Sequence, residues 1–368
     1  EVKQIINIAL GLEGLRRQDG IHAAAVVISP DTITKYLPVQ QKGKDAELVT
    51  QFEMHTVEQL GLLKMDFLGL RNLSIIDRTI KLITDEKIDI DNISLDDSKT
   101  YELLAEGKMI GVFQLESRVA QSTSRSLKTK TFEDIVALVA LIRPGPLGAG
   151  MHNEFTDRAT GRKDIEYLHK DLEEILSETY GVILYQEQVM QIAQKISGFE
   201  LNEADELRKA MGKKIPKVME KQRDKFKDGA IKNGYSEQFA IELFDQIAYF
   251  AGYGFNKSHS VPYALLAYQT AYLKANYPAE YLAASLTAVK RDKDRTAVFL
   301  AEAREMGVNV STPDINLSSA DFTVNDNEIL FGLSAVRNVG DITADKIVKE
   351  RIENGNFESV EEFLSRID

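Results

Sequence analysis

The spacing of apolar residues along the chain predicts a mostly helical protein with β-structure near its beginning. Residues 2–17 carry apolar side chains on one side of a helix, and the runs at 23–29, 47–52 and 61–67 are typical of short strands. Beyond them the helical period dominates, and it predicts helices at 71–84, 97–106, 131–142, 170–178, 187–197, 202–212, 216–234, 236–250, 258–276, 278–288 and 291–306. We therefore expect an α+β fold that is mostly α.

The pattern changes again near residue 312. Residues 322–331 predict a β-hairpin that turns at about 325–327, and two helices follow it. Prolines on either side of a glycine at 143–147 predict a rigid turn between helices. Domain boundaries are expected near residues 70 and 310.

The composition is that of an ordinary globular protein, with 368 residues, 43% hydrophobic and 28% charged. No run of about 18 apolar residues occurs, so no membrane span is expected. The absence of cysteine excludes a disulfide scaffold and a thiolate metal site, and the five histidines lack zinc-site spacing. Because no signal segment is present either, we expect a cytoplasmic protein. The chain lacks an initiator methionine and stops just after a helical segment, so we expect an excised piece of a longer one.

The net charge of −12 argues against a protein that coats nucleic acid with its whole surface. Residues 208–227 nevertheless hold nine Lys or Arg against two acids, which leaves +7 there and −19 elsewhere. An acidic body with one basic stripe is typical of a protein that grips a polyanion along one face. A solvated helix face is the alternative interpretation.

Residues 250–260 are the most informative segment. Asn256, Lys257, Ser258 and His259 place four polar groups at the start of a predicted helix, with Ser258 as a natural N-cap. A helix N-terminus presents free N–H groups and partial positive charge, so an adjacent lysine makes a site suited to phosphate. The alternative is a polar cap on a surface turn.

Three other places suit phosphate or metal chemistry. Lys64 and Asp66 lie on one face of a predicted strand, since side chains alternate. They suit a phosphate contact beside a Mg²⁺ ligand, or simply a solvated pair. The helix at 202–212 carries Arg208 and Lys209, which suit phosphate or the helix dipole, and Lys213 and Lys214 follow it.

The third place is residues 334–348, which fit a helix–hairpin–helix with its tight turn at Val339 and Gly340. Such hairpins present backbone N–H groups to a DNA phosphate without reading sequence. The usual first glycine of the turn is Asn338 here, which tolerates the left-handed conformation better than most residues. An ordinary helical hairpin is the alternative.

Several sequence runs together resemble one family, the bacterial replicative DNA polymerase III alpha subunits, also called C-family polymerases. The runs are IHAAAVVI (21–28), GLLKMDFLGLR (61–71), GVFQLES (111–117), LIRPGPL (141–147), ETYGVILYQEQVM (178–190), LRKAMGKK (207–214) and residues 250–268. They occur in family order and span nearly the whole chain.

The resemblance implies a domain order. Residues 1–19 would end a thumb, and residues 20–70 would form the second half of a polymerase-beta-type palm with a mixed sheet. Residues 71–310 would be helical fingers. Residues 311–368 would add the hairpin and the helix–hairpin–helix motif as the C-terminal part of the fingers.

The resemblance also implies residue roles. Asp66 would be a catalytic, metal-binding carboxylate, and Lys64 would contact phosphate beside it. The nucleotide-binding residues would be Arg208, Lys209, Tyr253, Asn256, Lys257 and His259. The DNA-binding residues would be Val339, Gly340, Lys213 and Lys214. The family more often has a second arginine where Lys209 stands.

The implied reaction is nucleotidyl transfer from dNTP to a primer 3′ end with two Mg²⁺ ions, on primer–template DNA, in chromosomal replication. The family's other carboxylates lie upstream of this segment, so we expect the chain alone to be inactive. Contacts with the sliding clamp and other replisome subunits would use parts absent here. The alternatives are a non-catalytic nucleic-acid-binding module that keeps fingers and hairpin, and a protein–protein scaffold.

Overall fold

A computed structural model describes residues 2–15, 19–43, 46–213, 216–251 and 253–367, without the side chains of 211–218 and 251. The chain forms two compact units that divide between Leu70 and Arg71. Among the described residues, no helix is both long enough and apolar enough to cross a lipid bilayer. The expected α+β fold that is mostly α is confirmed.

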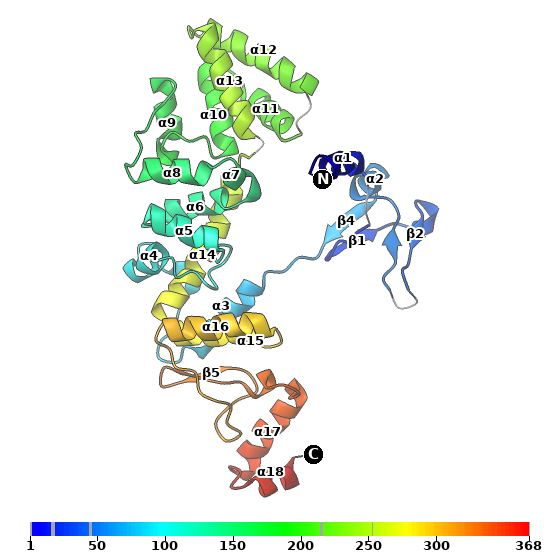
Figure 1. The fold of residues 1–368 in the computed structure, drawn as a ribbon, viewed down its shortest axis with the longest axis vertical. Coiled ribbons are helices and arrows are strands. Elements are labelled where there is room, and N and C mark those ends of the chain that lie inside the picture. The colour runs from blue at the N-terminus through cyan, green and yellow to red at the C-terminus, as the bar shows by residue number, and fades with distance from the viewer. Residues whose placement is uncertain (1, 16–18, 44–45, 214–215, 252, 368) are drawn as a thin grey trace. The chain divides into compact units, whose positions relative to one another are not determined.

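The first unit contains the early β-structure. Its elements are α1 (Val2–Leu12), β1 (Ala25–Ile28), the 3₁₀ turn Ile33–Lys35, β2 (Val39–Gln40), β3 (Val49–Thr50), α2 (Met54–Gln59) and β4 (Leu63–Asp66). β1 pairs with β4 and β2 with β3 (Figure 1), and both pairs are antiparallel. The described strands of this unit therefore form small antiparallel sheets rather than the expected mixed sheet.

The second unit is built mainly from helices. The first half contains α3 (Arg71–Leu82), α4 (Ser98–Ala105), α5 (Arg118–Leu127), α6 (Phe132–Leu141), α7 (Pro144–Gly148), α8 (Met151–Ala159), α9 (Glu173–Leu176) and α10 (Gln186–Ser197). The second half contains α11 (Leu201–Lys213), α12 (Pro216–Lys232), α13 (Glu237–Ala251), α14 (Lys257–Asn276), α15 (Pro278–Val289), α16 (Lys293–Glu305), β5 (Thr323–Asn325), β6 (Glu328–Leu330), α17 (Asp341–Asn354) and α18 (Val360–Arg366). Among the described residues of this unit, 3₁₀ turns lie at Ile90–Asn92, Lys170–Leu172, Ser177–Thr179 and Leu333–Ala335.

The long helix α14 is central to the second unit, and it packs against α3, α4, α6 and α15 (Figure 1). Tyr268, fully buried on α14, donates its hydroxyl to the Ser94 carbonyl and accepts from the Asp97 N–H. Lys274, on the same helix, is also fully buried and is ion-paired with Glu302 of α16. The N-terminal turn of α14, where the polar segment lies, is thus attached to a rigid core.

The predicted helices of the second unit are present within a few residues of their expected ends, but three others were missed. Residues 143–147 were expected to form a turn between helices, and Pro144–Gly148 is instead the short helix α7. Proline suits the first helical position because its missing N–H has no intrahelical partner there. α5 and α8 were also missed, and so was α2 in the first unit.

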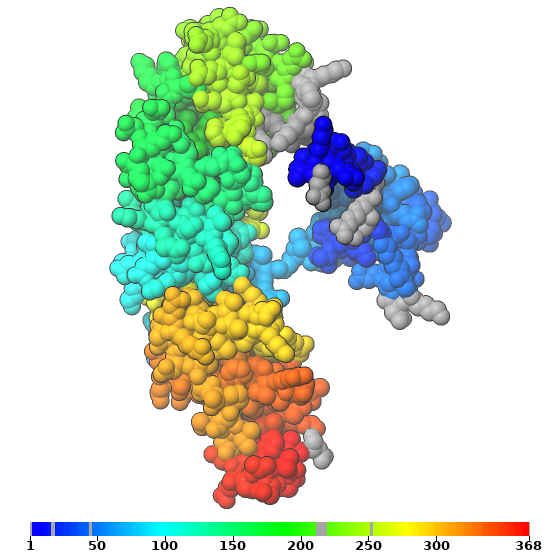
Figure 2. All heavy atoms as spheres, in the orientation of Figure 1, coloured from blue at the N-terminus to red at the C-terminus, as the bar shows by residue number. Residues whose placement is uncertain are grey.

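The C-terminal segment follows the predicted hairpin. β5 pairs with β6, and Asp326 and Asn327 between them have φ of 47° and 64°, as a tight two-residue turn requires. Leu333, Ala344, Ile347 and Phe357 then form a small separate core. In Figure 2 the orange and red spheres of this segment lie packed against one another.

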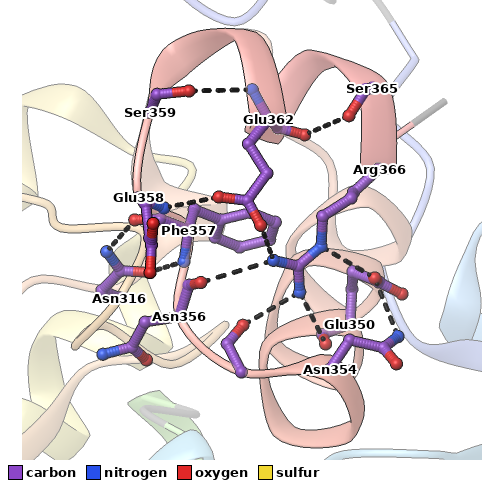
Figure 3. Close-up of polar contacts among 11 residues, drawn as sticks. Asn316, Glu350, Asn354, Asn356, Phe357, Glu358, Ser359, Glu362, Ser365 and Arg366 are labelled. Carbon is purple, nitrogen blue, oxygen red and sulfur yellow. Dashed lines mark hydrogen bonds and ion pairs between the residues drawn. The ribbon is translucent and has the colours of Figure 1, made fainter.

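Arg366 holds the turn between α17 and α18 (Figure 3). Its guanidinium donates to the Glu350 carboxylate at 3.0 Å, the Glu362 carboxylate at 2.8 Å and the Gly355 carbonyl at 2.9 Å. It also lies over the Phe357 ring, 4.3 Å from the ring centroid, at a cation–π distance. The side chain that closes this turn is therefore an arginine fully engaged in contacts.

Candidate functional site

The N-terminus of α14 differs from its prediction. The N-cap is Asn256, whose side-chain oxygen accepts the His259 N–H at 2.9 Å, so the expectation that Ser258 caps the helix is wrong. The Lys257 N–H donates to both carboxylate oxygens of Glu187, at 2.9 and 3.1 Å. A protein carboxylate therefore already occupies the place that the sequence assigned to an anion.

The Lys257 ammonium is also engaged. It pairs with Glu178, and it lies 5.3 Å from the centroid of the Tyr185 ring. A phosphate at this lysine would have to compete with Glu178. Asn256 and His259, in contrast, are exposed on the first turn of the helix.

The loop before α14 is held from the α6–α7 junction. Arg143 donates to the Tyr253 carbonyl at 2.7 Å and to the Ala140 carbonyl at 2.9 Å, and its guanidinium lies 4.1 Å from the centroid of the Phe255 ring. A Cβ on Gly145 would come within 2.4 Å of the Tyr253 ring, so only glycine allows this approach. The position of Tyr253 is therefore set by several contacts.

Several aromatic rings contact one another around this turn. The His259 ring lies over the Tyr263 ring with centroids 4.3 Å apart, and it meets Phe255 edge-on at 5.4 Å. Tyr249 packs edge-on against Tyr253 at 6.0 Å. Such a face is suited to stacking with a planar ligand such as a base.

The cations of α11 share one acidic partner. Arg208 and Lys209 both pair with Asp205, at 2.8 and 2.7 Å, and the hydrogen bond from Lys209, followed by that from Arg208, lowers the pKa of the Asp205 carboxyl. The Lys209 side chain is 62% exposed and that of Arg208 31%. The side chain of Lys213 and the whole of Lys214 lie outside the described residues, so their predicted role is not placed.

The basic stripe of residues 208–227 is partly neutralised in the fold. On α12, Arg223 pairs with Asp245 at 2.9 Å, Lys225 with Glu203 at 2.6 Å and Lys227 with Glu237 at 3.7 Å. These partners come from neighbouring helices. The net charge of +7 counted from the sequence therefore overstates the positive electrostatic potential that a polyanion would meet at this surface.

In the first unit, Lys64 and Asp66 share one face of β4, as the alternation predicts. The Lys64 ammonium lies 2.8 Å from each Asp66 oxygen, and this hydrogen bond is the main cause that lowers the pKa of the Asp66 carboxyl. His22 lies 3.6 Å from the same carboxylate. The ionised carboxylate suits one ligand position of Mg²⁺. Among the described side chains, however, no group of three or more acids and histidines is arranged to hold a metal ion.

The turn before α17 places its left-handed residue at Asn338. Asn338 has φ of +69°, whereas Gly340 is the N-cap with φ of −81° and open space around its Cβ position. Asn338 therefore takes the left-handed conformation that it was expected to tolerate, and Gly340 adopts an extended conformation that other residues also reach. The Val339 N–H donates to the Val336 carbonyl.

The first helix of the predicted helix–hairpin–helix is only the 3₁₀ turn Leu333–Ala335. Gly340 provides no side-chain cap for α17. Because the Val339 N–H is already hydrogen-bonded to the Val336 carbonyl, the N–H groups that this turn could present to a phosphate begin at Gly340.

Sequence reasoning missed the residues that support the site. Glu187, Glu178 and Arg143 each contact the 253–257 loop from a distant part of the chain. No local pattern marks such partners, because spacing along one helix says nothing about a carboxylate contributed by another.

Family models match three parts of the chain. The model for the bacterial DNA polymerase III alpha subunit finger domain matches residues 72–234, and the model for the bacterial DNA polymerase III alpha NTPase domain matches residues 1–69. A helix-hairpin-helix motif model matches residues 307–368.

Curated relatives match along the whole chain. DNA polymerase III subunit alpha of Saccharopolyspora erythraea is 48% identical over 99% of this chain and 31% of its own length. The proteins of that name from Thermus aquaticus and Vibrio cholerae are 47% and 46% identical over 100% of this chain, and over 30% and 33% of their own lengths. The chain thus spans about a third of these relatives.

Proposed function

Because this chain belongs to the bacterial DNA polymerase III alpha subunit family, we propose that it is the palm–fingers part of a replicative DNA polymerase. The observation that carries the proposal is identity of 45–48% over 99–100% of the chain to proteins named for that subunit. The partners would be primer–template DNA, dNTP, the sliding clamp and other replisome subunits. The place of action would be the cytoplasm.

In the proposed reaction, the primer 3′-hydroxyl attacks the α-phosphorus of a dNTP, a new P–O bond forms and pyrophosphate leaves. Two bound Mg²⁺ ions would stabilise the charge on the entering and leaving oxygens. Asp66 would supply one metal ligand from this chain, and Lys64 would neutralise phosphate beside it. Carboxylates from an upstream segment would complete the set, so we propose that the 368-residue chain alone does not extend a primer.

The fingers would bind the nucleotide. Arg208 and Lys209 would exchange their shared partner Asp205 for the triphosphate, since a carboxylate and a phosphate offer similar acceptors. Tyr253 and His259 would line the nascent base pair, with Asn256 and Lys257 between them. The aromatic face of His259, Tyr263 and Phe255 supports this part of the proposal.

Removing the α11 cations tests the nucleotide site. In the full-length protein, Arg208→Ala and Lys209→Ala should each raise the KM for dNTP about 10- to 100-fold, because one charge-assisted phosphate contact is worth about 1.5–3 kcal/mol. Steady-state dNTP titrations on a fixed primer–template measure the effect. Arg223→Ala is the matched control, since Arg223 also pairs with an aspartate and belongs to the same basic stripe. A fall in DNA affinity with an unchanged KM for dNTP would instead assign Arg208 and Lys209 to the template.

The hairpin before α17 would contact DNA backbone without sequence preference, through N–H groups from Gly340 onward. Asn338→Val should weaken binding of a labelled duplex, because a left-handed residue with a β-branched side chain costs at least about 1–2 kcal/mol. Asn338→Gly should bind as the wild type does. Fluorescence anisotropy at fixed salt measures both. Wild-type affinity in a folded Asn338→Val variant would show that this turn does not touch DNA.

A further inference from the structure

One side chain joins the two parts of the candidate nucleotide site. The Gln186 side-chain oxygen accepts from the Arg208 guanidinium at 3.3 Å, and its NH₂ group donates to the Gly254 carbonyl at 3.4 Å. Arg208 belongs to α11 and Gly254 to the loop before α14, so these contacts bridge segments far apart in the sequence.

The backbone of Gln186 is fixed to the same loop. Its N–H donates to the Phe255 carbonyl at 2.8 Å, and the Phe255 N–H donates to the Leu184 carbonyl at 3.1 Å. Tyr185 and Phe255 thus form a short parallel β-bridge. The next residue, Glu187, accepts the Lys257 N–H, so the loop is held by Leu184, Gln186 and Glu187. Gln186 is half-buried there and cannot move independently of the loop.

The chemistry of the bridge requires an amide. One end must accept from a guanidinium, and the other must donate to a carbonyl. A glutamate of the same size would satisfy Arg208 but would place an acceptor against the Gly254 carbonyl. An alanine would satisfy neither partner. The oxygen and the NH₂ group of the Gln186 amide therefore have different roles, one as acceptor for Arg208 and the other as donor to Gly254.

We infer that Gln186 is a positioning residue that couples the Arg208 guanidinium to the 253–257 loop. When Arg208 moves from Asp205 to a phosphate, its hydrogen bond with Gln186 is altered. The hydrogen bond from the Gln186 amide to Gly254 then transmits this movement to the loop. Since the loop carries Tyr253 and leads to His259, the coupling would make the grip on the triphosphate depend on the base pair beside it. This last step rests on the proposed function, whereas the coupling itself is a property of the fold.

Hydrogen–deuterium exchange of the 368-residue chain tests the coupling without any polymerase activity. The Phe255 and Lys257 N–H groups, both hydrogen-bonded here, are the reporters. Gln186→Ala and Arg208→Ala should each speed exchange in peptides covering 253–257, and the double variant should exchange no faster than the faster single one. Gln194→Ala, on the exposed side of α10, and Arg223→Ala should leave these peptides unchanged. Unchanged exchange in Arg208→Ala would overturn the coupling, even if Gln186→Ala loosens the loop.

Nucleotide selection tests the consequence. In the full-length protein, Gln186→Ala should lower kcat/KM for the correct dNTP about tenfold, the effect of losing one hydrogen bond to a charged group. Gln186→Glu should also lower it, because this variant keeps the acceptor for Arg208 but loses the donor to the Gly254 carbonyl. The kcat/KM for incorrect dNTPs should fall less, so the ratio of kcat/KM for correct over incorrect dNTPs should become smaller. The melting temperature of the protein should stay within a few degrees of the wild-type value. Equal losses for correct and incorrect dNTPs would overturn the role in selection. If the protein incorporates no nucleotide at all, the proposed function fails, and the exchange experiment still decides the coupling.

Discussion

An Asp66→Asn variant of the full-length protein is expected to lose kcat by about three powers of ten or more, with a small change in DNA affinity. Asparagine keeps the size of the side chain but removes the charge that would bind Mg²⁺ and that Lys64 now neutralises. Single-turnover incorporation with saturating dNTP separates this chemical step from binding.

The matched control for Asp66→Asn is Asp31→Asn in the same unit. Asp31 also pairs with a nearby lysine, Lys35, and the hydrogen bond from that lysine is the main cause that lowers the pKa of its carboxyl. This variant should keep wild-type kcat. If Asp66→Asn reduces kcat only about tenfold or less, the Lys64–Asp66 pair is structural and the proposed catalytic role is wrong.

A Lys274→Met variant should destabilise the second unit by about 3–5 kcal/mol, because it leaves a buried carboxylate without its partner. The Lys274 ammonium is 0% exposed and donates to the Lys108 and Ile110 carbonyls, at 2.8 and 2.9 Å, as well as to Glu302, which is 7% exposed. Burial lowers the pKa of this ammonium, and Glu302 opposes the shift. Urea unfolding of the 368-residue chain, followed by circular dichroism, measures the loss.

Two variants control the interpretation of Lys274→Met. Lys293→Met changes an exposed lysine on α16, the helix that carries Glu302, and should alter stability by less than about 0.5 kcal/mol. Lys274→Met combined with Glu302→Gln should recover part of the loss, since the buried charge is then removed. A loss below about 1 kcal/mol in Lys274→Met would mean that water reaches Glu302 and that α14 is not anchored here.

Most helices could be predicted because their apolar positions face a core, and the hairpin at 323–330 could be predicted from its turn residues. The exceptions have specific causes. α5 has few apolar residues and is stabilised by the Ser117 cap and burial of Ala120 and Leu127. α7 begins at a proline. Proline is favoured at the first position of a helix but breaks a helix interior, and the sequence alone did not show which position it would take.

The candidate site could be predicted in its residue types but not in its partners. Lys257 and Arg208 were identified from local pattern and resemblance, yet Lys257 contacts Glu178 and Arg208 contacts Gln186, partners that sequence spacing does not reveal. The left-handed residue of the turn at 338–340 could be predicted, since Asn338 stands at the position of the usual first glycine and tolerates that conformation. The extended conformation of Gly340 could not be predicted, because it depends on the whole turn rather than on one residue type.

Template-directed incorporation decides whether the full-length protein is a DNA polymerase. The purified full-length protein would be given Mg²⁺ and a primer–template with one known templating base, and each dNTP would be offered separately. We expect addition of the complementary nucleotide, and loss of that addition in Asp66→Asn. DNA binding without incorporation, or incorporation that ignores the templating base, would contradict it and favour a non-catalytic nucleic-acid-binding protein.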